Sequence, residues 1–236
     1  MKRIGLITPY TSEATIAEFY RMIPEGAELV VRSFGVDRLQ AEEFAAAFRR
    51  IEQALDDLER AGVDYLVVTG ELVLCSRGPE GNRQVLEDAR KRSPLGATTV
   101  LTAVVEGLQS LGVSRAAMAS PFTEAHDETV VRFLGASGIT ILAQRCVGLN
   151  SNPEIAQLEP ETGYAQAEAA LRAAPAAQGL YMPCANWRVT PVIPRIEATF
   201  GVPVVANLQA WIWAAARALG VSPRPGCGRL LDTLLE

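Results

Sequence analysis

Residues 3–11 read RIGLITPYT, and residues 115–123 read RAAMASPFT. Both stretches begin with Arg and end with a hydroxyl residue, Pro, an aromatic residue and Thr, in the same order and at the same spacing. Each is an apolar run that stops at a Pro, which is typical of a strand that ends in a turn. We interpret the repeat as a duplication, because the elements predicted after each copy also follow in the same order.

A second matching pair supports the duplication. VDYLVVTGEL (63–72) and AQGLYMPCAN (177–186) both follow a long helical pattern and both end in a turn. We infer two similar α/β halves that face each other, with their strand ends meeting at a cleft. The predicted N-terminal half is residues 1–95 plus about 207–236, because the last helix is expected to cross back, and the C-terminal half is residues 96–206.

Strand-like and helix-like segments alternate along the whole chain, which predicts parallel sheets with right-handed crossovers. In such sheets, ligands bind at the carboxyl ends of the strands. The predicted strands are 3–8, 28–32, 65–69, 116–120, 139–143, 180–183 and 204–206. The predicted helices are 41–61, 99–111, 124–134, 164–174, 192–200 and 209–219, and the candidate N-caps at the repeat are Thr11 or Ser12 and Thr123.

The composition is that of an ordinary globular protein, with 236 residues, 49% of them hydrophobic. The net charge of −5 argues against a nucleic-acid partner, which usually needs a basic face. The apolar start is too short for a signal-peptide core, and no apolar stretch approaches the roughly 20 residues of a membrane helix. We therefore predict a cytoplasmic protein without a membrane partner.

The four cysteines form no C-x-x-C pair, and His126 is the single histidine. Neither a metal site nor a redox motif is therefore predicted. In the cytoplasm such thiols stay free. Cys184, in LYMPCANWR, follows a predicted strand and precedes a predicted helix. We expect its thiol to face the cleft with a pKa lowered by the positive end of that helix; the alternative is a buried structural cysteine.

Several segments carry a family resemblance: RIGLITPYT, GLQSLGVSRAAMASPFTEAHDE, LYMPCANWRVTPVIPRIEATFGVPVVANLQA and PRPGCGRLLD. Together they resemble the aspartate/glutamate racemase superfamily, in its arylmalonate decarboxylase and maleate isomerase branch. The resemblance implies two pseudo-symmetric flavodoxin-like (Rossmann-like) α/β domains, each with a four-stranded parallel sheet, and an active-site cleft between them. It also implies a small carboxylic acid as substrate and no cofactor, neither a metal ion nor pyridoxal phosphate.

The resemblance implies that Cys184 is the proton donor of a decarboxylase. Racemases and isomerases of the superfamily add a second cysteine from the first half. The repeat places that partner at Leu72 or Gly70, and neither is a cysteine. Cys75 lies a few residues further on. Glu71 could be the opposite-face base if burial raised its pKa, although a solvated loop position is the commoner outcome for a glutamate.

The predicted substrate donors are backbone N–H groups at the turns Pro9–Ser12, Gly70–Leu72 and Ala185–Asn186. The chain departs from the family at three of its donor positions. Glu71-Leu72 replaces a Thr-Ser pair, Phe122 replaces a tyrosine, and Thr11-Ser12 stands where the isomerases carry an asparagine. The candidate substrate-binding residues are Pro9, Tyr10, Thr11, Ser12, Gly70, Leu72, Ser120, Phe122, Thr123, Ala185 and Asn186.

We favour a cofactor-independent decarboxylase that protonates an enediolate of a small malonate-like acid through Cys184, because decarboxylation needs only one proton donor. The second hypothesis is a maleate cis–trans isomerase or an aspartate, glutamate or hydantoin racemase that uses Cys184 with Cys75 or Glu71. The third is a catalytically silent carboxylate-binding protein, which the replaced donors suggest. A homo-oligomer stays open, since exposed helices after each half could pair two copies.

Overall fold

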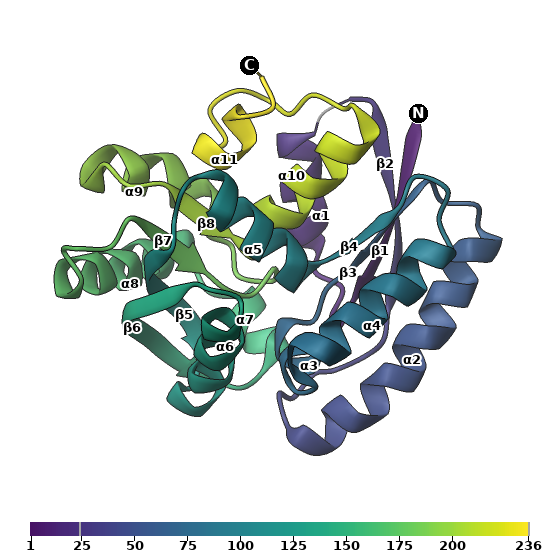
Figure 1. The fold of residues 1–236 in the computed structure, drawn as a ribbon, viewed down its shortest axis with the longest axis horizontal. Helices are drawn as coiled ribbons and strands as arrows, with labels where there is room; N and C mark the ends of the chain where they lie inside the picture. Colours follow the sequence, from purple (N-terminus) through teal and green to yellow (C-terminus); the bar gives the residue numbers. More distant parts are fainter. Residues whose placement is uncertain (24, 236) are drawn as a thin grey trace.

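The computed structural model describes residues 1–23 and 25–235. Over these residues the apolar runs become eight strands in two parallel sheets (Figure 1). The first sheet contains β1 (Lys2–Thr8), β2 (Ala27–Ser33), β3 (Tyr65–Val68) and β4 (Ala97–Thr99). The second contains β5 (Arg115–Phe122), β6 (Thr140–Leu149), β7 (Gly179–Met182) and β8 (Val204–Ala206).

The two sheets have the same topology. Their strand orders are β2-β1-β3-β4 and β6-β5-β7-β8, and every pair of neighbouring strands is parallel. β3 and β7 are buried along their whole length, which explains why their sequences are continuous apolar runs rather than alternating ones. The predicted α/β architecture with two four-stranded parallel sheets is therefore confirmed.

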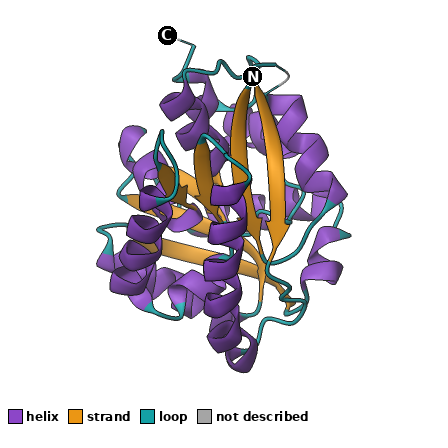
Figure 2. Cartoon of the chain, turned by 90° about the vertical axis from the view of Figure 1, so that its right-hand side faces the viewer, coloured by secondary structure: helices purple, strands orange, loops and turns teal. Residues whose placement is uncertain are grey.

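Helices cover both faces of the sheets (Figure 2). They are α1 (Glu13–Met22), α2 (Ala41–Arg60), α3 (Glu71–Cys75), α4 (Gly78–Lys91), α5 (Val100–Ser110), α6 (Glu124–Ala136), α7 (Asn152–Ala156), α8 (Pro160–Ala173), a 3-10 turn η1 (Thr190–Val192), α9 (Ile193–Phe200), α10 (Asn207–Leu219) and α11 (Arg229–Asp232). None of the described helices is long and apolar enough to cross a membrane. The sequence pattern predicted α1 only through its N-cap, and it predicted neither the short helices nor α4. Thr123 caps α6 as predicted, whereas Ser12 stands at the N-cap of α1 without a side-chain hydrogen bond.

The helix after the last strand of each sheet packs on the other sheet. α5 follows β4 and contacts β8, and α10 follows β8 and contacts β3 and β4. The rings of Phe19 in α1 and Trp211 in α10 also stack, with centroids 5.8 Å apart. α10 thus packs on the first sheet, whereas α11, which follows it, contacts β8 of the second sheet.

The division into residues 1–95 plus 207–236 and residues 96–206 stays a prediction, but its boundary needs one correction. β4 begins at Ala97 and pairs with β3, so the first sheet ends only at Thr99. The sequence pattern did not predict β4, because this strand has three residues and continues directly into α5.

Two loops join the halves beside the cleft. The loop after β2 and the loop after β6 form a small antiparallel bridge between Arg38 and Ser151. The backbone N–H of Leu39 donates to the carbonyl of Asn150 at 2.9 Å, and that of Asn152 donates to the carbonyl of Asp37 at 2.9 Å. The carboxyl ends of the two sheets are therefore tied together rather than merely adjacent.

The turns after β3 and β7 share an unusual backbone conformation. Gly70 has a φ of +101°, and Cys184 has a φ of +73°. Cys184 is the one non-glycine residue with a positive φ among those described. The left-handed region is unfavourable for a residue with a Cβ. Matching strand ends therefore pairs Cys184 with Gly70 rather than with Leu72.

An added methyl group at Gly70 tests how tightly this turn is packed. A Cβ there would lie 2.8 Å from Phe34 Cζ, whereas at Gly112, with a φ of +70°, it would meet no described atom within 4 Å. We expect Gly112→Ala to lower the free energy of unfolding by about 1 kcal/mol, from backbone strain alone. Gly70→Ala should lower it by roughly 3 kcal/mol, because overpacking adds to that strain. Urea unfolding measures both, and equal losses would contradict the predicted clash.

Candidate active site

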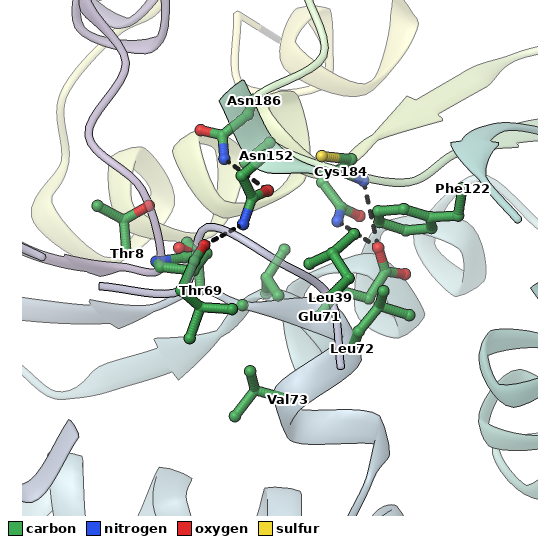
Figure 3. Close-up of a pocket in the computed structure, with 16 residues that line it drawn as sticks. Thr8, Leu39, Thr69, Glu71, Leu72, Val73, Phe122, Asn152, Cys184 and Asn186 are labelled. Atoms are coloured by element: carbon green, nitrogen blue, oxygen red, sulfur yellow. Dashed lines mark hydrogen bonds between the residues drawn. The ribbon is translucent and has the colours of Figure 1, made fainter. Parts of the chain in front are cut away.

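A pocket with about 430 Å³ of space that no atom fills lies where the two sheets meet. Residues at or just after the carboxyl ends of all eight described strands line it, as the strand-end rule predicts. The lining residues are Thr8, Pro9, Val36, Leu39, Thr69, Gly70, Glu71, Leu72, Val73, Val100, Phe122, Asn152, Cys184, Ala185, Asn186 and Asn207 (Figure 3). None of them carries a positive charge.

The structure brings eight of the candidate site residues to this pocket. They are Pro9, Gly70, Glu71, Leu72, Phe122, Cys184, Ala185 and Asn186. The lining residues that sequence reasoning missed are Thr8, Val36, Leu39, Thr69, Val73, Val100, Asn152 and Asn207. The strand-end rule could have found Asn207 directly after β8. No pattern in the sequence points to Leu39 or Asn152, because the loops that carry them meet only through the tertiary fold.

Five other candidate residues are not among those that line the pocket. Thr11 is exposed, Tyr10 is partly exposed and Ser12 is buried at the start of α1. Ser120 is fully buried, and its hydroxyl accepts from the backbone N–H of Phe122 at 2.9 Å. Thr123 caps α6.

Cys75 also lies outside the pocket. It is one helical turn past Glu71 in α3, and it lines a separate pocket against His126, Arg132 and Phe133 of α6. Burial raises the pKa of its thiol well above the usual range, and the nearby Glu71 raises it further. This position does not place Cys75 opposite Cys184.

Cys184 lies at the wall of the pocket with 7% of its surface exposed. Burial raises the pKa of its thiol to about 12, and the backbone N–H groups of Asn186 and Trp187 offset this only in part. The predicted lowering of its pKa is wrong because no helix starts at this turn: the next helical element is η1, at Thr190. The Cys184 sulfur is therefore a protonated thiol at neutral pH.

Glu71 is buried, with 4% of its surface exposed, so the interpretation as a solvated loop residue is wrong. Its Oε2 accepts from the backbone N–H of Cys184 at 3.2 Å and from the side-chain amide of Asn207 at 2.8 Å. Its Oε1 bonds to the hydroxyl of Tyr181. Burial raises the pKa of Glu71 to about 7, against the lowering effect of these hydrogen bonds. Figure 3 shows its carboxyl group beside Phe122, with one dashed line to the main chain of Cys184.

Tyr181 is a hydrogen-bond partner of Glu71 that no sequence pattern indicated. It is a fully buried residue within β7, in the middle of an apolar run. Its hydroxyl bonds both to Glu71 and to Oδ1 of Asn207, the latter at 2.7 Å. The hydroxyl group of a tyrosine in a buried strand leaves the apolar pattern of the sequence unchanged. The pattern therefore does not distinguish such a tyrosine from an ordinary core residue.

The turns at Gly70–Val73 and at Ala185 carry the donors that remain free. No acceptor among the described residues faces the backbone N–H groups of these positions. The side-chain hydroxyls of Thr8 and Thr69, by contrast, are already donated to the carbonyls of Tyr10 and Ile7. Free backbone N–H groups on facing turns can bind a carboxylate or an enediolate.

Comparison with known proteins identifies the family. The model of the arylmalonate decarboxylase family matches residues 4–231. The chain belongs to this family. An arylmalonate decarboxylase from Bordetella bronchiseptica is 28% identical over 231 residues, which cover 97% of this chain and 96% of that protein. A maleate isomerase from Nocardia farcinica (strain IFM 10152) is 25% identical over 241 residues, which cover 98% of this chain and 96% of that protein.

A solved structure extends the comparison to three dimensions. A crystal structure of a double mutant of arylmalonate decarboxylase in its liganded form has a TM-score of 0.91 and 26% identity to this chain. It covers 99% of this chain, and all of its own chain is matched. These findings confirm the resemblance and the two-domain α/β fold, and they place the chain among decarboxylases and isomerases.

Two of the buried carboxyls, whose pKa burial raises to about 7, predict how stability depends on pH. Burial raises the pKa of Glu71 from 4.5 to about 7 and that of Asp127, in α6, from 3.8 to about 7. Between these values the folded chain holds more protons than the unfolded chain, so the free energy of unfolding falls as pH rises from about 4.5 to about 7. In Glu71→Gln the titration of residue 71 is absent while those of the other buried carboxyls remain, so the fall becomes shallower. Urea unfolding at several pH values measures it, and a slope equal to that of the unsubstituted chain would contradict the buried titration.

Proposed function

We propose that this chain is a cofactor-independent decarboxylase of a small malonate-like carboxylic acid, with Cys184 as the proton donor. The observation that carries the proposal is a buried thiol at the wall of a pocket that no cation lines, with no second cysteine among the lining residues. Loss of carbon dioxide from a malonate leaves an enediolate, and one proton donor then completes the reaction.

The high pKa of Cys184 favours this chemistry over the alternatives. A donor must hold its proton until the enediolate forms, and a buried thiol does so. A cis–trans isomerase needs a thiolate nucleophile, and a racemase needs a base on the opposite face of the α-carbon. Gly70 occupies the position that matches Cys184, and Cys75 faces α6 instead.

The proposed steps use groups that the pocket supplies. Leu39, Val73 and Phe122 are among its apolar walls, and one carboxylate held against such walls loses its solvation and departs as carbon dioxide. The electron pair of the broken carbon–carbon bond passes into the remaining carboxylate to give the enediolate. The thiol of Cys184 gives its proton to the α-carbon, and the resulting thiolate takes a proton from water.

Backbone donors would hold the enediolate. The free N–H groups of Gly70–Val73 and Ala185 lie on the two turns that flank the pocket. They do not depend on side chains, so they survive the replacement of the family's Thr-Ser pair by Glu71-Leu72 and of its tyrosine by Phe122. Preorganised donors of this kind are worth several kcal/mol, about 3 kcal/mol for each donor in a water-free site.

The pocket supports an acid with one apolar substituent. Its apolar walls can contact an aryl or alkyl group. The four free cysteines are compatible with action in the reducing cytoplasm, which we propose as its compartment.

Removal of the Cys184 thiol tests the proposal. With phenylmalonate and methylphenylmalonate as probes, we expect Cys184→Ala to lower kcat at least about 1,000-fold, because the general acid is lost. Release of carbon dioxide measures turnover, and circular dichroism checks the fold. Cys75→Ala is the matched control: a buried thiol outside the pocket is removed, so turnover should stay close to that of the unsubstituted chain.

Two results would contradict the proposal. The first is undiminished turnover in Cys184→Ala. The second is exchange of the α-proton of a monoacid in heavy water without loss of carbon dioxide, which would indicate a racemase.

A further inference from the structure

We propose that Glu71 is a positioning residue that holds the main chain of Cys184 in its left-handed conformation, and that it does so as an uncharged carboxylic acid. The inference rests on the proposed role of Cys184 and goes beyond it. It gives a role to Glu71, one of the two residues that replace the family's Thr-Ser pair in this chain.

The conformation of Cys184 requires a reason. A φ of +73° is unfavourable for a residue with a Cβ, and such strain persists only where neighbouring groups enforce it. The matching turn of the first half avoids the strain with Gly70. Cys184 therefore needs a contact that the first half does not need.

Glu71 supplies that contact from the opposite half. The backbone N–H of Cys184 donates to Glu71 Oε2 at 3.2 Å, and it has no other acceptor among the described residues. Oε2 is itself fixed by the amide of Asn207 at 2.8 Å. Glu71 follows β3 of the first sheet, whereas Cys184 and Asn207 follow β7 and β8 of the second, so the carboxyl group ties the cysteine turn to the first half.

A count of protons around Tyr181 gives the charge of Glu71. The hydroxyl of Tyr181 lies between Glu71 Oε1 and Asn207 Oδ1, and it has one proton to give. The amide nitrogen of Asn207 is already directed at Glu71 Oε2, so its Oδ1 must accept from Tyr181. All contacts are satisfied when Glu71 is protonated and donates to Tyr181. The three side chains then close a ring of hydrogen bonds, and no charge is buried.

This ring determines what Glu71 can do. Both carboxyl oxygens are engaged, so Glu71 is not free to take a proton from a substrate. The titratable groups that face it are Asp127 of α6, Cys75 of α3, and Tyr181 and Cys184 on and after β7. None of them is a cation, so among the described residues only hydrogen bonds, and no positive charge, offset a negative charge at Glu71. Its ionisation would repel both an anionic substrate and the enediolate.

Two substitutions of Glu71 separate positioning from base catalysis. In Glu71→Gln, the amide can donate to Tyr181 and its oxygen can accept from Cys184 and Asn207, which copies the neutral acid. We expect kcat close to that of the unsubstituted chain below pH 7, and no loss of activity on the alkaline side. In Glu71→Leu the acceptor is lost, and we expect kcat to fall about 100-fold through misplacement of the thiol.

A second readout does not depend on turnover. The alkylation rate of Cys184 by iodoacetamide, followed by peptide mass spectrometry, reports how the thiol is held. We expect Glu71→Gln to match the unsubstituted chain below pH 7 and Glu71→Leu to react several-fold faster, because the freed turn exposes the sulfur. If no malonate is turned over but these rates differ as stated, the proposed function fails and the positioning role stands.

Two outcomes would overturn the inference. One is loss of turnover in Glu71→Gln with normal alkylation of Cys184, which would make Glu71 a base. The other is an equal alkylation rate in all three proteins. Glu197→Gln is the matched control, since Glu197 is another buried carboxyl that accepts from backbone N–H groups, those of Val204 and Arg229, away from the pocket. It should leave the pH profile unchanged.

Discussion

Exclusion of water from the ends of eight parallel strands is the constraint on which this site depends. The two loops that tie the halves also line the pocket, and Cys184 and Glu71 are buried there together. In such surroundings an ionised thiol or carboxyl is costly unless a cation is near. The pocket has no cation, so both groups keep their protons to a higher pH than they would in water. Burial thus favours the role of proton donor that we propose for Cys184 over that of a nucleophile.

Much of the fold could be predicted because its signals are local and repeated. The RIGLITPYT and RAAMASPFT stretches mark β1 and β5, and the strand-end rule places Cys184, Gly70 and Phe122 at one pocket. β4 escaped detection because three residues carry too little pattern. The ionisation of Cys184 was predicted with the wrong sign, because the sequence does not show that burial outweighs the nearby backbone donors.

The polar network around Glu71 lies beyond what the sequence can give. Tyr181 comes from β7, Asn207 follows β8 and Glu71 opens α3, so three distant segments meet only in the folded chain. The family resemblance showed that Glu71-Leu72 replaces a Thr-Ser pair of hydrogen-bond donors. It did not show which groups bind the substrate in place of those hydroxyls. In the proposed mechanism, backbone N–H groups bind the acid, while the carboxyl group at position 71, which accepts from the backbone N–H of Cys184, supports the cysteine turn.

The ionisation state of Cys184 is the claim on which the mechanism turns. The ultraviolet difference spectrum between the unsubstituted chain and Cys184→Ala, recorded across the pH range in which the fold is stable, detects the thiolate directly. The account predicts no thiolate signal from this residue at neutral pH, with the signal growing only in alkali. A thiolate band at neutral pH that the substitution removes would contradict the account and would favour a nucleophilic cysteine.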